Sequence, residues 1–298
     1  MKSPRYLSLL LSAFILAATT SSAQSVTSDV VGYTTKTLNT GVSLTSFPLI
    51  KAPAFSGTLA ADSVNGTVIT VGATLSGDSS YYLHVTSGSA EGSFESITAS
   101  DATTVTIEAA IAGLAAGDNV RIVEHNTLSD LTEASGNSIP DNTTVTIYNS
   151  DGSADTYTIF SGTWYDSGFG SANDVIVFPG EGVAVGMPSS ANLTFAGTVN
   201  TESYAVELTS GVVNILSSLN PTSPTGDTAL GAALGSLADN STVTAYSEDG
   251  ALSGDTYTLF SGVYYDAAFS AATINPAAPS AVVVSPSASG TISLAPAL

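Results

Sequence analysis

The chain lacks cysteine and is poor in bases: its 298 residues include 5 Lys and Arg against 25 Asp and Glu. Without cysteine there is no disulfide framework, cysteine-ligated metal centre or thiol nucleophile. Phosphate backbones and anionic membranes are bound by clustered Lys and Arg, so we expect neither nucleic acid nor an anionic membrane as a partner. The hydrophobic content of 43% is nevertheless high enough for a folded core.

Motifs of common enzyme classes are also missing. There is no Gly-x-Ser-x-Gly nucleophile elbow, and neither Lys36 nor Lys51 lies in a phosphate-binding glycine pattern. The glycines of Gly180–Gly186 have the wrong spacing for a dinucleotide-binding loop. A pair of carboxylates for glycoside hydrolysis stays open among 25 acids, but the sequence singles out no pair.

The first residues have the three parts of a secretory signal. Lys2 and Arg5 form a positive start, Leu7–Ala18 is apolar, and Ser21–Ala23 offers small residues for cleavage after Ala23. The apolar run is shorter than the roughly 20 residues of a membrane span. We therefore expect a protein that is secreted, periplasmic or on the cell surface, with no membrane span after signal removal. Its three remaining bases against 25 acids would give a net charge of −22.

Short runs rich in Val, Ile, Thr, Tyr and Phe recur between clusters of Gly, Ser, Asn and Asp. Alternation is clearest in Thr144–Tyr148, where Val145 and Ile147 share one face and threonines the other. One segment, Thr228–Leu237, has a helical apolar stripe. The pattern predicts an all-β protein built from sandwich-like or barrel-like units.

Two parts of the chain match each other. Asp141–Tyr148 corresponds to Asp239–Tyr246, and Asp155–Gly162 corresponds to Asp255–Gly262. The matches extend to the following aromatic residues, which are Trp164, Tyr165 and Phe169 in one copy and Tyr264, Tyr265 and Phe269 in the other. This agreement predicts an internal duplication of one β-unit.

The upstream spacing differs between the copies: Gly41 to Asp141 spans 100 residues, whereas Gly211 to Asp239 spans 28. The difference predicts a small β-barrel-like insertion of about 72 residues in the first copy, as tolerated at loop tips. We expect a signal peptide at 1–23, a first β-unit from 24–62 plus 136–199, an inserted domain at 63–135, and a second β-unit at 200–298.

Several motifs resemble those of a known family of proteins. They are Val31-Gly32-Tyr33, Tyr81-Tyr82 with Thr86–Gly92, Ile97–Asp101, Arg121–His125, and Pro179–Gly182 before an apolar strand. With these motifs the chain resembles an uncharacterised family of secreted all-β proteins found mainly in Verrucomicrobia and related bacteria. The resemblance implies an exported bacterial protein and supplies no activity or catalytic residues.

The repeated aromatics are candidates for stacking on sugar rings: Trp164, Tyr165, Tyr264 and Tyr265. The alternative is that part of this set is core. Adjacent residues of a strand point to opposite faces, so at most one of Trp164 and Tyr165 is buried in a one-sided sheet.

Two weaker site hypotheses concern ions. His84, His125 and Glu124 combine imidazole and carboxylate ligands for a metal, against the alternative of ordinary strand histidines. Asn149, Asp151 and Asp155 place oxygen ligands at alternating positions, as in a calcium loop. The closing Glu of such a loop is missing, and Asp151-Gly152 favours a hairpin turn instead.

The sequence thus predicts an exported, non-catalytic β-protein that acts as a structural, adhesive or cell-surface interaction module. The first alternative is a carbohydrate-binding protein that uses the repeated aromatic hairpins, with polysaccharide as its partner in place of another surface protein. A carboxylate-based glycoside hydrolase is the second. We expect no cofactor, with Ca²⁺ as the one candidate ion.

Overall fold

The computed structural model describes residues 30–60, 66–72, 74–75, 80–133, 139–221, 228–246, 254–274 and 281–296. Over these ranges the regular structure is almost entirely β-strand, with two short helices, so the predicted all-β class is confirmed. No helix in this part of the chain is both long and apolar enough to cross a membrane. The expected signal segment 1–23 lies outside the described residues.

Unit 1 is a sandwich of two antiparallel layers. A five-stranded sheet with the order β12-β11-β10-β14-β2 packs against the pair β1-β15, and a core that includes Leu38, Trp164 and Phe195 lies between them. A further short pair, β9-β13, and helix α1 complete the unit. Its elements are β1 (Val31–Leu38), β2 (Gly41–Ser46), β9 (Asn126–Thr127), α1 (Asp130–Glu133), β10 (Thr144–Tyr148), β11 (Ala154–Phe160), β12 (Thr163–Tyr165), β13 (Ile176–Val177), β14 (Gly182–Met187) and β15 (Ala191–Thr198).

Alternation of apolar and hydroxylated residues builds these strands. In β10, Val145 and Ile147 are buried as predicted, and Thr144 and Thr146 lie on the opposite face. Thr146 Oγ1 lies 2.9 Å from Thr156 Oγ1 on the next strand, which is a typical cross-strand pair. Lys36 on β1 is buried and donates a hydrogen bond from Nζ to the carbonyl oxygen of Leu44, 3.1 Å away.

Unit 2 has the same arrangement. Its larger sheet has the order β17-β22-β18-β19-β20-β21, and the pair β16-β23 covers it. The register is also equivalent, because Val145 faces Tyr157 across β10 and β11, while Val243 faces Tyr257 across β18 and β19. Its elements are β16 (Tyr204–Leu208), β17 (Asn214–Ser217), α2 (Thr228–Leu234), β18 (Thr242–Tyr246), β19 (Gly254–Phe260), β20 (Val263–Tyr265), β21 (Ala271–Ala272), β22 (Ala281–Ser285) and β23 (Gly290–Leu294).

A curled six-stranded antiparallel sheet separates β2 from α1, and we call it the inserted sheet. Its strand order is β3-β8-β5-β6-β7-β4, and its core lies inside the curl. The sheet spans residues 55–124, whereas the spacing predicted 63–135, because β3 pairs with β8 while β9 pairs with unit 1. Its strands are β3 (Phe55–Thr58), β4 (Val68–Thr70), β5 (Tyr81–Val85), β6 (Phe94–Ser100), β7 (Thr104–Ile107) and β8 (Asn119–Glu124).

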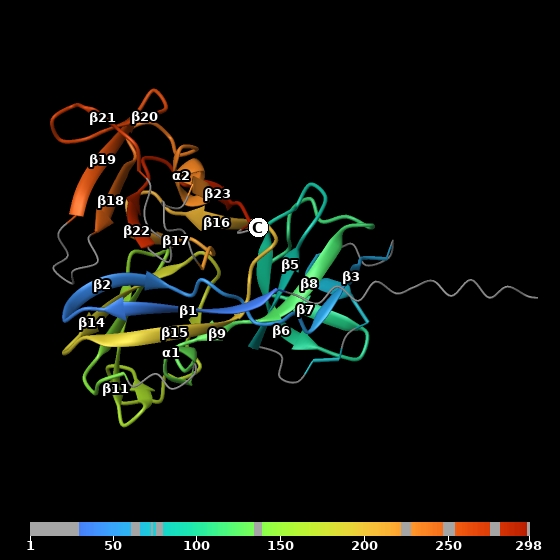
Figure 1. Cartoon of the computed structure of the whole chain (residues 1–298). Coiled ribbons are helices and arrows are strands. Elements are labelled where there is room, and N and C mark those ends of the chain that lie inside the picture. The colour runs from blue at the N-terminus through green and yellow to red at the C-terminus, as the bar shows by residue number, and fades with distance from the viewer. Residues whose placement is uncertain are drawn as a thin grey trace, which may run out of the picture.

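The two units meet along β2 and β14 of unit 1 and β17 and β22 of unit 2 (Figure 1). The backbone N–H of Ser217 donates to the carbonyl oxygen of Gly180 at 2.8 Å. A Cβ at Gly182 would lie 2.5 Å from the side chain of Ile215, so only glycine allows this approach. In each sheet the joint lies at one edge, and the hairpin β11-β12 or β19-β20 lies at the opposite edge.

Candidate functional site

Trp164 and Tyr264 occupy equivalent core positions. Trp164 is fully buried in the core of unit 1, and Tyr264 is 7% exposed in the core of unit 2. The Tyr264 hydroxyl donates to the carbonyl oxygen of Leu234 at 2.8 Å. The prediction that these two side chains stack on glycans is therefore wrong, because their face of the hairpin is the one that packs against the core.

The outward face of the same hairpin carries three other aromatic residues in each unit. Half-exposed Tyr165 and Tyr265 are the two predicted stacking residues that the structure leaves accessible. We call these groups the first tip, formed by Phe160, Tyr165 and Phe169, and the second tip, formed by Phe260, Tyr265 and Phe269.

Phe169 and Phe269 are the most exposed members of the tips, at 76% and 80%. Both have a positive φ, of 60° and 61°. A left-handed conformation costs a non-glycine residue about 1–2 kcal/mol. Two exposed phenylalanines therefore have the same unfavourable backbone conformation, with no core packing to compensate for it.

An aspartate holds each of these loops in place. Asp166 Oδ1 accepts hydrogen bonds from the backbone N–H groups of Gly168 and Gly170, both at 2.8 Å. In unit 2 the same atom of Asp266 accepts from the backbone N–H groups two and four residues later, at 2.9 and 2.8 Å. One ring pair lies together in each tip, with centroids 6.5 Å apart for Phe160 and Tyr165 and 5.6 Å apart for Tyr265 and Phe269. Each tip thus presents aromatic side chains from a loop whose backbone is held by an aspartate.

The two histidines lie where the inserted sheet packs against both units. His84 stacks on Tyr204 of unit 2 with ring centroids 3.9 Å apart, and its Nε2 lies 2.8 Å from the carbonyl oxygen of Ser203. His125 packs edge-on against Phe178 of unit 1, with centroids 5.4 Å apart. Burial lowers the pKa of each imidazole to about 4, so both are neutral at pH 7.

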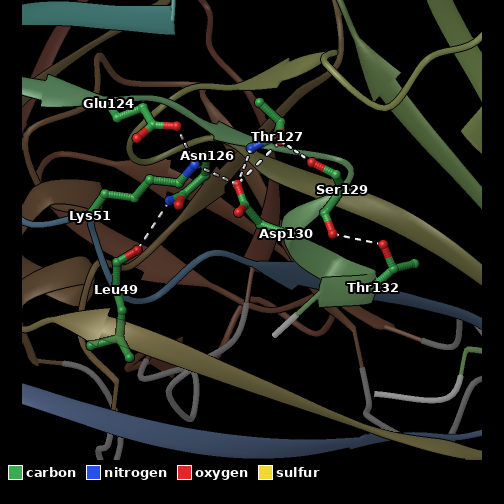
Figure 2. Close-up of polar contacts among 8 residues, drawn as sticks. All are labelled: Leu49, Lys51, Glu124, Asn126, Thr127, Ser129, Asp130 and Thr132. Atoms are coloured by element: carbon green, nitrogen blue, oxygen red, sulfur yellow. Dashed lines mark hydrogen bonds and ion pairs between the residues drawn. The ribbon is translucent and has the colours of Figure 1, made fainter. Parts of the chain in front are cut away.

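The structure does not bring Glu124 together with these imidazoles. Glu124 Oε1 instead pairs with Lys51 Nζ at 3.0 Å, and Lys51 also contacts Asp130 at 3.2 Å (Figure 2). Over the ranges that the structure describes, no three His, Asp or Glu side chains are placed to hold a metal ion. The metal prediction for His84, His125 and Glu124 is therefore wrong.

The network in Figure 2 instead joins the inserted sheet to unit 1. Asp130 Oδ2 accepts from the backbone N–H of Thr127 at 2.7 Å, and Asn126 donates from Nδ2 to the carbonyl oxygen of Leu49 at 3.1 Å. Lys51 precedes the inserted sheet, and Glu124 ends it. The ion pair therefore closes the neck of the insertion.

Asn149, Asp151 and Asp155 form a hairpin turn between β10 and β11. Asp151 Oδ1 accepts from the backbone N–H of Ser153, and Asn149 donates to the Asp155 carboxylate at 2.9 Å. Gly152 has a positive φ of 87°, as the turn requires. The turn prediction is confirmed. Ser153 engages the Asp151 carboxylate and Asn149 engages that of Asp155, so the turn accounts for these side chains, and calcium binding there stays a prediction.

A cleft of about 650 Å³ opens between the two units and the inserted sheet. Aromatic and aliphatic side chains form much of its wall, and Phe94 and Phe178 lie on it with ring centroids 6.5 Å apart. Three carboxylates line it, one from each part of the fold: Glu95, Glu181 and Glu207. A concave site with apolar walls and a few charged groups is typical of ligand binding.

Two of these carboxylates have a raised pKa. Burial raises the pKa of Glu181 to about 7, although the backbone N–H of Phe178 donates to its Oε2 at 3.0 Å. Burial also raises the pKa of Glu95, and the negative charges of Glu108 and Glu207 add to this shift. Among the residues that the structure describes, the lining of the cleft supplies no Lys or Arg to these carboxylates.

Sequence reasoning missed both the cleft and the exposed phenylalanines. The signal for the tips was present, since an Asp three residues before a Phe recurs at Asp166 and at Asp266. The cleft had no sequence signal, because its three carboxylates are separated by 86 and 26 positions and belong to different sheets.

The chain matches no known protein-family model, no curated protein and no solved structure. Its function is therefore argued from this geometry.

Proposed function

We propose that the chain is an exported, non-catalytic interaction module that contacts a cell-surface partner through its two aromatic tips. The observation that carries the proposal is the repeated exposed phenylalanine held at positive φ, Phe169 in one unit and Phe269 in the other. Backbone strain that is kept without packing is commonly found at functional positions. Its occurrence in both units supports a shared role.

The placement of the tips adds a second reason. Each lies at the sheet edge away from the joint between the units, and Figure 1 shows β20 and β21 at one end of the molecule and β11 at the other. Two equivalent sites at opposite ends allow one chain to contact two points of a repetitive surface. Binding at the second point is then intramolecular and raises the overall affinity.

The proposal includes a duplication as the origin of the two units. Matching strand order, matching register and positive φ at equivalent residues support it. Export is part of the same proposal and is supported by the secretory pattern of residues 1–23. Membership of the secreted family that the chain resembles is also part of the proposal.

Both histidines, Lys51 and Arg121 are engaged in contacts between parts of the fold, which supports a non-catalytic role. His84 and His125 are packed between sheets, Lys51 closes the neck of the insertion, and Arg121 pairs with Glu202 at 2.7 Å. Turnover of a defined substrate that is lost on mutation of a single acid would contradict this part of the proposal.

The test is sedimentation of the purified mature protein with isolated cell envelopes of the organism that makes it. We expect Phe169→Ala with Phe269→Ala to lower the bound fraction at least about tenfold, and each single variant to remove the gain from bivalency. Tyr33→Ala is the matched control, because Tyr33 is an aromatic residue 79% exposed on β1, away from the tips. Equal loss with Tyr33→Ala, or no loss in the double variant, would refute the proposal.

Carbohydrate is the second candidate partner, favoured by the half-exposed Tyr165 and Tyr265 beside acidic loops. Affinity electrophoresis in polysaccharide gels distinguishes carbohydrate binding from the binding of a protein partner. Retardation that Tyr165→Ala with Tyr265→Ala abolishes would identify a glycan partner, whereas envelope binding that survives removal of the polysaccharide would identify a protein.

A further inference from the structure

We propose that the cleft between the two units and the inserted sheet binds a small organic cation, an amine with an apolar body. The proposal is independent of the aromatic tips, since none of their residues lines the cleft. Its volume of about 650 Å³ is within the usual range for small-molecule sites. All three parts of the fold contribute to its wall.

The polar groups of the cleft determine the charge of the ligand. Asn214 donates from Nδ2 to the carbonyl oxygens of Thr209 and Val212 at 2.9 and 3.0 Å, so its amide hydrogens are already bonded. Glu207 is exposed, and its carboxylate forms no hydrogen bond or ion pair with the residues that the structure describes. The charged groups that line the cleft are all carboxylates, which accept hydrogen bonds from an ammonium group.

No base among the described residues neutralises these carboxylates. The lining contains neither Lys nor Arg. The three bases in the described part of the chain are bonded elsewhere: Lys36 to a backbone carbonyl oxygen, Lys51 to the neck of the insertion, and Arg121 to Glu202. A positive charge in the cleft must therefore come from a ligand.

The apolar walls of the cleft determine that the ligand has an apolar body. The rings of Phe94 and Phe178 lie at the cleft together with the side chains of Ile111 and Val206. Such a wall removes apolar surface of a ligand from water, and aromatic faces also attract an ammonium group. An apolar amine matches both features, whereas a small inorganic cation would leave these walls unused.

Binding of an amine should release a proton near neutral pH. The raised pKa of Glu181 means that part of this carboxyl is protonated at pH 7, and an ammonium group beside it favours the charged form. The other titratable groups around it are Glu95 and Glu207, which line the same cleft, and His125, which packs edge-on against Phe178. His125 stays neutral from pH 6 to 8 because its pKa is about 4.

The experiment is calorimetric titration of the full mature chain with phenethylamine in 0.15 M salt, with phenethyl alcohol as the neutral analogue. A single charge on the probe limits general attraction to the acidic surface. We expect saturable binding of the amine alone, an affinity that rises up to about tenfold from pH 6 to 8, and proton release revealed by buffers of different ionisation enthalpy.

Variants of the cleft carboxylates test whether the amine binds in the cleft. Glu207→Gln and Glu181→Gln should each weaken binding about tenfold, since each removes one charge partner. Glu91→Gln is the control, because Glu91 is exposed in the turn between β5 and β6 and does not line the cleft. Thermal melts of each variant confirm that it is folded. The proposal is overturned by absence of amine binding at about 10 mM, by equal binding of the alcohol, or by equal weakening in Glu91→Gln.

Discussion

The larger sheets of unit 1 and unit 2 share five equivalent strands, to which unit 2 adds β21, but the units differ in what connects β2 or β17 to the next strand. Unit 2 passes from β17 through α2 to β18, whereas unit 1 makes the inserted sheet before α1 and β10. Both helices lie in the same place, since α1 contacts β15 and α2 contacts the equivalent strand β23. The comparison shows that this fold accepts a whole sheet at one connection without a change in strand order, because the ends of the insertion lie close together at Lys51 and Glu124.

The units also differ at one core position. Unit 1 has Trp164, whose Nε1 has no hydrogen-bond partner among the described residues, and unit 2 has Tyr264, whose hydroxyl reaches Leu234 at the end of α2. A buried hydroxyl needs a partner, and the seven-residue helix supplies one. The same sheet therefore accepts different aromatic residues according to the element that covers it.

The largest expected effect is the loss of stability when the equivalent core residues of the two units are truncated. Trp164→Ala and Tyr264→Ala should each lower the free energy of unfolding by about 3–5 kcal/mol, because each leaves a large cavity between the layers. Urea denaturation measures the loss. Tyr165→Ala, next to Trp164 but half-exposed, is the control and should cost less than about 1 kcal/mol. A small loss in both core variants would mean that these side chains are not core.

The second effect is the pH dependence of stability that comes from His84 and His125, where the inserted sheet packs against both units. The folded imidazoles of His84 and His125 have a pKa of about 4 against 6.5 when unfolded, so the unfolded chain binds more protons between these values. Stability from these two groups is therefore present above pH 6.5 and falls by about 3 kcal/mol per histidine as the pH approaches 4.

Urea denaturation at several pH values measures this dependence. His84→Gln keeps a donor for the carbonyl oxygen of Ser203 but does not titrate, so it should remove about half of the acid slope. Glu181 acts in the opposite direction, since its raised pKa adds stability at acid pH that is lost as the pH rises from 4.5 to about 7. For this reason, the slope of unfolding free energy against pH is compared with and without His84→Gln in a Glu181→Gln background. An unchanged slope in His84→Gln would contradict the prediction.

The smallest effect concerns the tips, where the two units are alike. Phe169→Asn and Phe269→Asn should each raise the free energy of unfolding by roughly 0.5–1 kcal/mol, because asparagine adopts a positive φ more readily than phenylalanine. Chemical denaturation measures the gain, and Phe160→Asn is the control because Phe160 has no positive φ. A loss of stability in the tip variants, or an equal gain in Phe160→Asn, would show that the backbone there is not strained.

Much of the fold could be predicted from the sequence. Alternation in Thr144–Tyr148 predicted which side chains of β10 are buried, and the helical stripe at Thr228–Leu237 corresponds to α2. The boundaries of the inserted sheet were shifted, because Phe55–Thr58 pairs with a strand more than 60 positions later, and spacing alone does not reveal such a pairing.

The site was less accessible to sequence reasoning. Opposite faces for Trp164 and Tyr165 followed from strand geometry, but which face is covered depends on the layer that packs against it. Nothing in the identity of Phe169 reveals a positive φ, which the hydrogen bonds of Asp166 and the loop impose.

The sequence by itself determined the all-β class, the correspondence between the two halves and the shortage of bases, since these follow from periodicity, alignment and composition. Only the tertiary structure decided how the three bases in the described part of the chain are used and which acids meet at the cleft. Those outcomes depend on contacts between residues far apart in the chain, such as Arg121 with Glu202 and the meeting of Glu95, Glu181 and Glu207 at one cleft. Local sequence does not encode such contacts, because they form only when separate sheets pack together.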